Sequence, residues 1–198
     1  MSSESLDKFR RMLEEKLDWG SLATFVPNKR EPVYNWFYFK EGFSRDLVFK
    51  VLDMFNVKEG LALDPFCGSG TTLLACKQLG INAIGYDVLP IAVFASHVKT
   101  RDHDIGSLEN AAKVLLKQRF ERPNIDAPFI MRKAFSKYAL EDILLFRNEI
   151  SRFESPEKEF LLLALVNAAM KCSYAWKDGS VIKIRKRSVA PLRIMLRR

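Results

Sequence analysis

The segment from residue 64 to residue 72 has the composition of a ligand-binding turn. It reads Asp64-Pro-Phe-Cys-Gly-Ser-Gly-Thr-Thr72, and Gly68 and Gly70 carry no side chain that would keep a ligand from the main chain. A glycine turn between a strand and a helix presents backbone N–H groups to an anionic ligand group. Asp87 follows the next apolar run, where an acid accepts hydrogen bonds from ribose hydroxyls in nucleotide-binding folds. Two acids beside the glycines favour a ligand with an amine or a sulfonium over a polyphosphate.

Other glycine-rich motifs fit this segment less well. A phosphate-binding P-loop needs a lysine directly after its last glycine, and Thr71 follows Gly70 here. The dinucleotide fingerprint would need a third glycine at the position of Leu73. The remaining alternative is a turn that only connects two elements, and the nine-residue pattern together with Asp87 disfavours it.

The flanking sequence predicts the elements that position this turn. Leu61 to Asp64 is a short apolar run typical of a buried strand, and residues 71–79 form a helical segment that Gly80 ends. Residues 81–86 predict a second strand, and Pro90 suits the first turn of a further helix. Strand, turn, helix and strand make a βαβ unit with parallel strands and a right-handed crossover.

Helices are predicted for most of the remaining chain. Apolar spacing indicates an amphipathic helix over residues 4–18, and Ser44 is a plausible N-cap for the helix that follows it. An aromatic segment over residues 34–43 follows two prolines that make a continuous helix unfavourable. Helical patterns dominate after residue 105. Ser155 is expected to cap a helix that has Pro156 in its first turn and runs to about Trp176, and residues 181–185 alternate like a strand.

These elements predict an α/β protein with a Rossmann-like fold, a partial sheet and a large helical C-terminal part. We expect one structural domain with three parts: an N-terminal helix and aromatic segment over 1–43, a βαβ core over 44–104, and a helical region with a basic tail over 105–198. The apolar surface of a partial sheet predicts a dimer or a complex with a second polypeptide.

Charge and composition restrict the class of protein further. The chain has 198 residues, is 48% hydrophobic and carries a net charge of +8, of which seven positive charges follow Asp178. A basic tail of this kind binds nucleic-acid backbones or is simply solvated. The sequence has no secretory signal, no apolar run long enough to span a membrane and no CxxC pair, so a reduced, cytoplasmic protein without a membrane partner is expected.

Three segments resemble one family of enzymes. Residues 64–72 (DPFCGSGTT) are similar to the first motif of the S-adenosylmethionine-dependent DNA amino-methyltransferases, which methylate N4 of cytosine or N6 of adenine. Residues 85–90 (GYDVLP) resemble their second motif, and residues 39–44 (FKEGFS) resemble a flanking cofactor motif. The resemblance covers roughly residues 36–95. It implies S-adenosylmethionine as cofactor, DNA as partner and a role in restriction and modification, with RNA as an alternative because RNA methyltransferases carry related loops.

The resemblance also implies which residues bind the cofactor. The main chain of residues 66–70 would line the methionine moiety, Asp64 would lie near its amino group, Asp87 would bind the ribose, and Val88 would pack on the adenine. The implied cofactor-binding residues are Asp64, Pro65, Phe66, Cys67, Gly68, Ser69, Gly70, Thr71, Thr72, Asp87, Val88, Phe43 and Ser44.

No catalytic residue can be named from this sequence. Enzymes of this family bind the target amino group with a motif of Asp, Asn or Ser followed by two prolines and an aromatic residue. In this sequence no two prolines are adjacent, so the motif is absent. We therefore expect activity to require a second chain or a segment that carries this motif; a non-catalytic nucleic-acid-binding relative is the alternative. None of the cysteines follows a proline, so Cys67 is not expected to be a nucleophile, and His97, His103 and their neighbouring acids predict no metal site.

Overall fold

The computed structural model describes residues 13, 15–119, 123–124, 126–178 and 181–197, and the chain divides into two compact units. The first unit extends to Ser96, and the second begins at His97. Most of the predicted helix over residues 4–18 lies outside the described residues. Its described end is not α-helical, because residues 13, 15 and 16 have no regular structure and Leu17–Trp19 forms a 3-10 helix. The three-part division by residue number stays a prediction. In the described part of the chain, no helix is long and apolar enough to cross a membrane.

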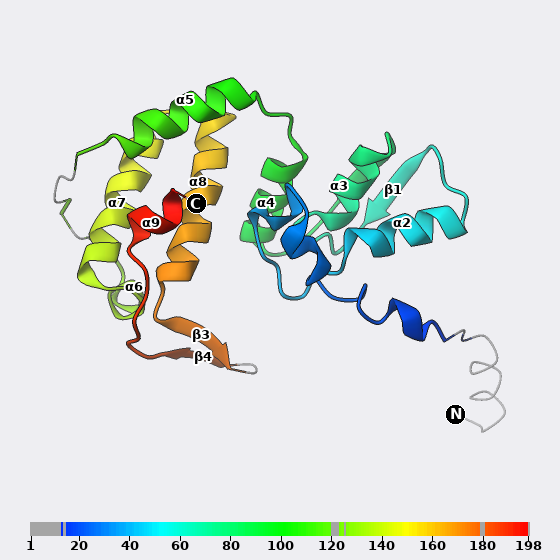
Figure 1. The fold of residues 1–198 in the computed structure, drawn as a ribbon, viewed down its shortest axis with the longest axis horizontal. Helices are drawn as coiled ribbons and strands as arrows, with labels where there is room; N and C mark the ends of the chain where they lie inside the picture. The colour runs from blue at the N-terminus through cyan, green and yellow to red at the C-terminus, as the bar shows by residue number, and fades with distance from the viewer. Residues whose placement is uncertain (1–12, 14, 120–122, 125, 179–180, 198) are drawn as a thin grey trace. The chain divides into compact units, whose positions relative to one another are not determined.

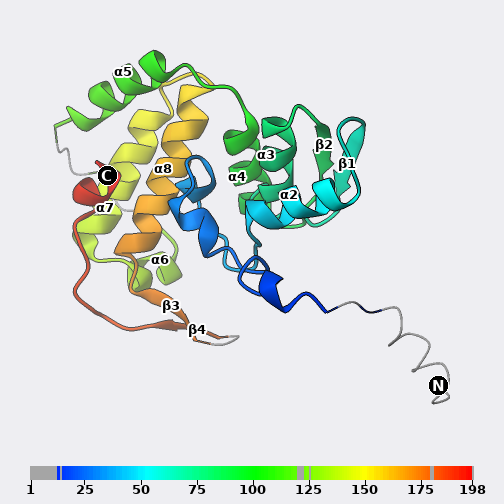
Figure 2. The same ribbon diagram turned by 45° about the vertical axis from the view of Figure 1, so that its right-hand side comes forward.

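The first unit is built on the predicted βαβ element. Strand β1 (Leu61–Asp64) pairs in parallel with β2 (Asn82–Gly85), and helix α3 (Thr71–Gln78) connects them (Figures 1 and 2). Helix α2 (Arg45–Met54) packs against α3, and α4 (Pro90–Thr100) begins at the predicted proline. The two strands, the starts of α3 and α4 and the parallel pairing are thus confirmed, but the burial expected of the first strand is wrong, because Leu61 and Leu63 are exposed.

Short 3-10 helices replace a continuous helix before α2, as the prolines predict. They are η1 (Leu17–Trp19), η2 (Pro27–Arg30) and η3 (Tyr34–Trp36). Several aromatic residues of this segment belong to the core: Phe25, Tyr34 and Phe37 are buried.

The segment from η2 to α2 is held by buried polar contacts. Asn28 is fully buried; its amide donates to the Phe43 carbonyl, and its Oδ1 accepts from the backbone N–H of Arg45, both at 2.9 Å. The hydroxyl of Tyr34 donates to Oε1 of Gln78 at 2.9 Å, which ties the segment to the end of α3. Side-chain hydrogen bonds therefore satisfy a stretch of backbone that has little secondary structure.

One face of the small parallel sheet is bare. Leu61 and Leu63 of β1 are both 64% exposed, and Ile84 of β2 is 43% exposed. Exposed and half-buried residues alternate along both strands, so these side chains lie on one face while the other packs inward. An apolar sheet face of this kind is normally covered by further structure.

The second unit is a group of helices followed by a hairpin. Its helices are α5 (Ile105–Leu116), α6 (Phe129–Ala134), α7 (Lys137–Ile150), α8 (Glu157–Cys172) and α9 (Leu192–Leu196) (Figure 1). Apolar side chains from α5, α7, α8 and α9 form one core that includes Leu115, Phe146, Ile150, Leu165 and Leu192. Strands β3 (Ala175–Asp178) and β4 (Val181–Ile184) pair in antiparallel fashion as a separate two-stranded sheet. The mixed α/β fold class with a large helical C-terminal part is confirmed.

Two details of the sequence prediction around α8 are wrong. The helix ends at Cys172 and not near Trp176, because Ser173 turns to an extended conformation and Tyr174 donates its backbone N–H to the Ala134 carbonyl at 2.7 Å. Trp176 then pairs with Lys183 in the hairpin. Ser155 does not cap the helix; its hydroxyl donates to the carboxylate of Glu159 at 3.0 Å. Tertiary pairing thus overrides the helical pattern of this segment.

Candidate functional site

The turn between β1 and α3 depends on glycine at position 70. Gly70 adopts a left-handed conformation with φ of +83° directly before the first residue of α3. A Cβ atom at this position would lie 2.3 Å from Oγ and 3.0 Å from Cα of Ser96 on α4. The main chain of the turn therefore approaches α4 as closely as a residue without a side chain permits.

Gly68 lies against the aromatic segment that precedes α2. Its φ is +51°, and a Cβ there would lie 2.9 Å from a ring carbon of Phe39. The segment that resembles the flanking cofactor motif is thus in contact with the glycine turn. Phe39 and Ser96 were missed among the predicted site residues; Phe39 begins the FKEGFS segment, whereas no pattern in the sequence marks Ser96.

Asp87 fastens the glycine turn to the end of β2. Its Oδ2 accepts a hydrogen bond from the backbone N–H of Gly68 at 2.9 Å, and its Oδ1 accepts from the N–H of Leu89 at 2.8 Å. An ionised carboxylate has about four acceptor positions, so two of them stay available for ligand hydroxyls. The acid that was predicted to bind a ribose also holds the turn in place.

Asp64 organises the turn from its other end. Its Oδ1 accepts from the N–H of Phe66 at 3.0 Å, and its Oδ2 accepts from the hydroxyl of Thr72 in the first turn of α3. The β-ladder continues beyond the strands, because Tyr86 donates its N–H to the Asp64 carbonyl and Cys67 donates to the Tyr86 carbonyl, both at 2.9 Å. The two acids and the ladder together fix the main chain from β1 to α3.

The start of α3 suits a negatively charged ligand group. Its N-cap is Gly70, which has no side chain to accept from the first N–H groups of the helix. Those N–H groups have no partner within the helix and carry the positive end of its dipole. A carboxylate such as that of a methionine moiety fits this position.

Exposed apolar side chains flank the same turn. Phe66 is 82% exposed, and Val88, directly after Asp87, is 93% exposed. Bare apolar surface beside an acid that can accept from sugar hydroxyls suits a nucleoside, whose ring packs while its ribose hydrogen-bonds. The predicted residues from Asp64 to Thr72 thus lie together with Asp87 and Val88 at one end of the sheet.

Phe43 and Ser44 lie farther into the structure. Ser44 is fully buried, and its Oγ accepts from the backbone N–H of Asp46 at 3.2 Å, which is an N-cap of α2. Its own N–H donates to the Leu22 carbonyl at 2.8 Å. Phe43 is half-buried, and its carbonyl accepts from Asn28. Their part in cofactor binding stays a prediction.

Cys67 lies within the turn but is not activated. Burial raises the pKa of its thiol, and the negative charges of Asp64 and Asp87 raise it further. The thiol is therefore protonated at neutral pH, and a protonated thiol is a poor nucleophile.

The two histidines have partners in the second unit. His97 lies 3.3 Å from the carboxylate of Glu159, and a ring nitrogen of His103 lies 2.7 Å from the Val98 carbonyl. Among the described residues, no group of three His, Cys, Asp or Glu side chains has the arrangement of a metal site.

Comparison with known proteins identifies the relatives of this chain. Residues 11–93 match the family model for a DNA methylase of the N6/N4 type. The Type II methyltransferase M.BsoBI of Geobacillus stearothermophilus is 32% identical over 194 residues, which is 91% of this chain and 37% of that protein. The Type II methyltransferase M.MjaII of Methanocaldococcus jannaschii is 30% identical over 79% of this chain and 31% of its own length.

The chain therefore spans well under half the length of these relatives. No solved structure gives a significant match. The residues that match the family model include the turn from Asp64 to Thr72 and Asp87. The chain belongs to the family of S-adenosylmethionine-dependent DNA amino-methyltransferases.

Proposed function

We propose that this chain is the cofactor-binding part of an enzyme that methylates an exocyclic amine in DNA, N4 of cytosine or N6 of adenine. The observation that carries the proposal is the glycine turn that Asp87 holds beside the start of α3, through the hydrogen bond from Gly68 to Asp87. We expect the enzyme to act in the cytoplasm, and the DNA methylase family match supports DNA as its substrate.

Different residues at the turn would bind different parts of the cofactor. S-adenosylmethionine supplies an electrophilic methyl group on a positively charged sulfur. The first N–H groups of α3 would bind its carboxylate, and the carboxylate of Asp64 would attract its ammonium group. Asp87 would accept hydrogen bonds from the ribose hydroxyls through its remaining lone pairs, and Val88 would pack on the adenine. The main chain of Gly68 and Gly70 would leave room for the ligand.

Transfer of the methyl group requires a part that this sequence does not contain. A polar residue followed by two prolines and an aromatic residue holds the target amine in this family, and no such motif occurs here. We propose that a second chain or a further segment supplies it and covers the bare sheet face of Leu61, Leu63 and Ile84. Burial of this face would contribute about 25 cal/mol for each Å² of apolar surface, and the entropy cost of association would offset part of this gain.

Calorimetric titration with S-adenosylhomocysteine tests the cofactor site. The wild-type chain should bind it, and Asp87→Ala should weaken binding tenfold or more, which corresponds to about 1.4 kcal/mol. Asp53→Ala, an exposed acid on α2 with the same change of charge, is the control and should bind as wild type does. Equal affinities of the Asp87 and Asp53 variants would contradict the assigned site.

Methyl transfer tests the requirement for a further part. The chain alone should transfer no labelled methyl group to DNA. Co-expression with the portion of M.BsoBI that this chain does not match should give a complex that does, and nucleoside analysis of the product would identify the methylated base. Transfer by the isolated chain would show that no further part is needed.

A further inference from the structure

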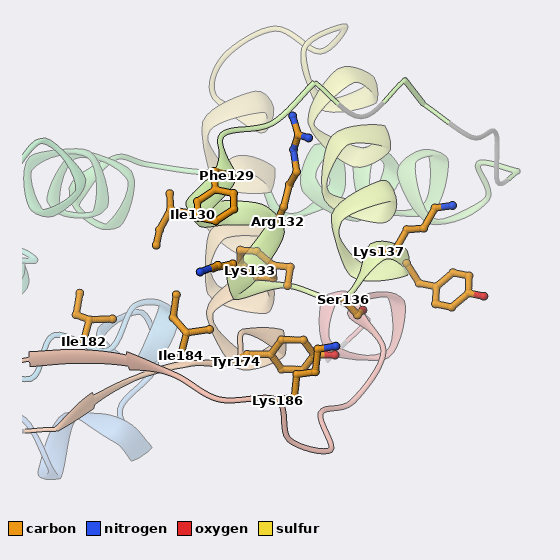
Figure 3. A pocket seen from close by; sticks show the side chains of 12 residues that line it. Phe129, Ile130, Arg132, Lys133, Ser136, Lys137, Tyr174, Ile182, Ile184 and Lys186 are labelled. Atoms are coloured by element: carbon orange, nitrogen blue, oxygen red, sulfur yellow. The ribbon is translucent and has the colours of Figure 1, made fainter.

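A groove in the second unit is lined by positively charged side chains and by apolar side chains. It has a volume of about 870 Å³ and lies between α6, the start of α7 and the β3–β4 hairpin (Figure 3). Four cations line it, and no acid does so among the described lining residues; the cations are Arg132, Lys133, Lys137 and Lys186.

Some cations of the second unit form ion pairs with acids, whereas the groove cations form none among the residues that the structure describes. Elsewhere Arg101, Arg152 and Arg193 form ion pairs with Glu159, Glu149 and Asp142 at 2.8–2.9 Å. In the part of the chain that the structure describes, no carboxylate lies within ion-pair distance of the four groove cations. Concentrated positive charge without a protein counter-charge attracts an anionic partner and releases its counterions on binding.

Apolar surface is exposed beside these charges. Phe129 on α6 is 70% exposed, Tyr138 on α7 is 74% exposed, and Ile182 on β4 is 72% exposed. The ammonium group of Lys133 lies 4.5 Å from the ring centre of Phe129. A phosphate would be attracted to the lysine, and an aromatic ring so close to it can pack against a sugar or an unstacked base.

The framework of the groove is held by hydrogen bonds. Arg132 donates from Nε to the Ala127 carbonyl at 2.8 Å, which fixes the chain before α6. Arg187, directly after Lys186, donates from two guanidinium nitrogens to the Ser173 carbonyl, and Tyr174 donates its N–H to the Ala134 carbonyl. The hairpin and α6 are therefore joined before any ligand binds, which lowers the entropy cost of binding.

We propose that this groove binds DNA, with backbone phosphates at Arg132, Lys133, Lys137 and Lys186 and a sugar or base against Phe129 or Tyr138. The inference rests on the proposed function, since it assigns to the second unit the contact that a DNA-modifying enzyme needs. The groove is formed entirely by the second unit, so its binding does not depend on the cofactor turn.

Salt dependence of DNA binding by the full chain tests this assignment. A fluorescently labelled duplex is titrated at several salt concentrations, and the slope of log K against log salt is measured. Lys133→Gln combined with Lys186→Gln should lower the magnitude of the slope by about 1.8, because each phosphate contact contributes about 0.9. Lys58→Gln combined with Lys113→Gln removes the same charge from exposed positions outside the groove and should leave the slope nearly unchanged.

Three results would overturn the proposal. They are equal losses in the two double variants, absence of DNA binding by the wild-type chain, and tighter binding of an RNA hairpin through the same two lysines. Phe129→Ser should weaken DNA binding about fivefold or more without a change of slope, because stacking does not release counterions. All these variants should bind S-adenosylhomocysteine as wild type does. A result against DNA binding by the groove can therefore be distinguished from a result against the cofactor site.

Discussion

The proposed binding sites of the two units are built in opposite ways. In the first unit the main chain forms the site. Gly68 and Gly70 have no side chains that would block it, and the carboxylates of Asp64 and Asp87 accept hydrogen bonds from its N–H groups. In the second unit the groove is formed by side chains, namely four cations that form no ion pair among the described residues, exposed aromatic rings on α6 and α7, and the exposed Ile182 on the hairpin.

This difference determines which changes each region tolerates. A main-chain site depends on a few residues whose conformation or lack of a side chain no other residue reproduces. A side-chain surface spreads its contribution over several charges, and loss of one charge removes one contact. We expect single substitutions to abolish function in the first unit and to reduce it by steps in the second.

Replacement of Gly70 should have the largest effect. Gly70→Ala places a Cβ 2.3 Å from Oγ of Ser96 and also requires an unfavourable φ of +83°. Thermal unfolding should show destabilisation of several kcal/mol, as expected for overpacking together with backbone strain. Titration should show no detectable binding of S-adenosylhomocysteine.

Gly80→Ala separates the two causes. Gly80 ends α3 with a φ of +72°, but a Cβ there has no atom within 4 Å. This variant should lose only about 1 kcal/mol from backbone strain and should retain cofactor binding. Equal losses in both variants would show that conformation alone, and not close approach to Ser96, makes glycine necessary in the turn.

Lys99 on α4 should give the next largest effect. It is 3% exposed, and burial lowers its pKa to about 7. The unfolded chain therefore holds this proton between about pH 7 and pH 10.4 while the folded chain does not, so stability rises with pH through this range. The stability of Lys99→Met relative to wild type should therefore be about 2 kcal/mol more favourable at acidic pH, where folded wild type holds this buried group charged, than near pH 10.

Urea unfolding of both proteins on either side of this range checks the sign. Wild type should gain stability from about pH 6 to pH 9, and Lys99→Met should gain less. Lys113→Met removes an exposed lysine and should leave the pH dependence unchanged. A wild-type stability that falls over this range would contradict the lowered pKa.

The ease of prediction from sequence follows the same contrast between the regions. The glycine turn was predicted with its strands and helices because Asp64, Gly68, Gly70 and Asp87 are local signals within one βαβ unit. The groove was not predicted, because its residues come from three elements that only tertiary packing brings together. The predicted end of α8 was wrong for the same reason, because the pairing of Trp176 with Lys183 in the hairpin outweighs a helical pattern.

Ser44→Ala should have a smaller effect and would define the role of this residue. Loss of the N-cap of α2 should lower the free energy of unfolding by about 1 kcal/mol. Ser136→Ala is a matched control, since Ser136 caps α7 in the second unit through the Ala139 N–H at 3.1 Å. A contribution of Ser44 to the cofactor site would appear as a loss of S-adenosylhomocysteine affinity beyond that of the control.

Glu159 on α8 should give the smallest effect. Burial alone would raise the pKa of this carboxyl group, but a hydrogen bond from Ser155 and the charges of His97 and Arg101 lower it below its ordinary value. A lowered pKa stabilises the folded state above the unfolded value of about 4.3, and this stability is lost as pH falls through the folded value. Glu159→Gln should therefore cost about 1 kcal/mol or less near pH 7 and nothing in strong acid, because the cluster is partly exposed.

Glu157→Gln is the control for this measurement, because it removes an acid from the same first turn of α8. Any loss that comes only from the helix dipole should be equal in the two variants, whereas the loss specific to the ion pairs should appear with Glu159→Gln alone. Urea unfolding at neutral and acidic pH separates the two. If the Glu159 variant lost more stability than the Gly70 variant, side-chain pairing would be as decisive in the second unit as main-chain geometry is in the first, and the contrast between them would fail.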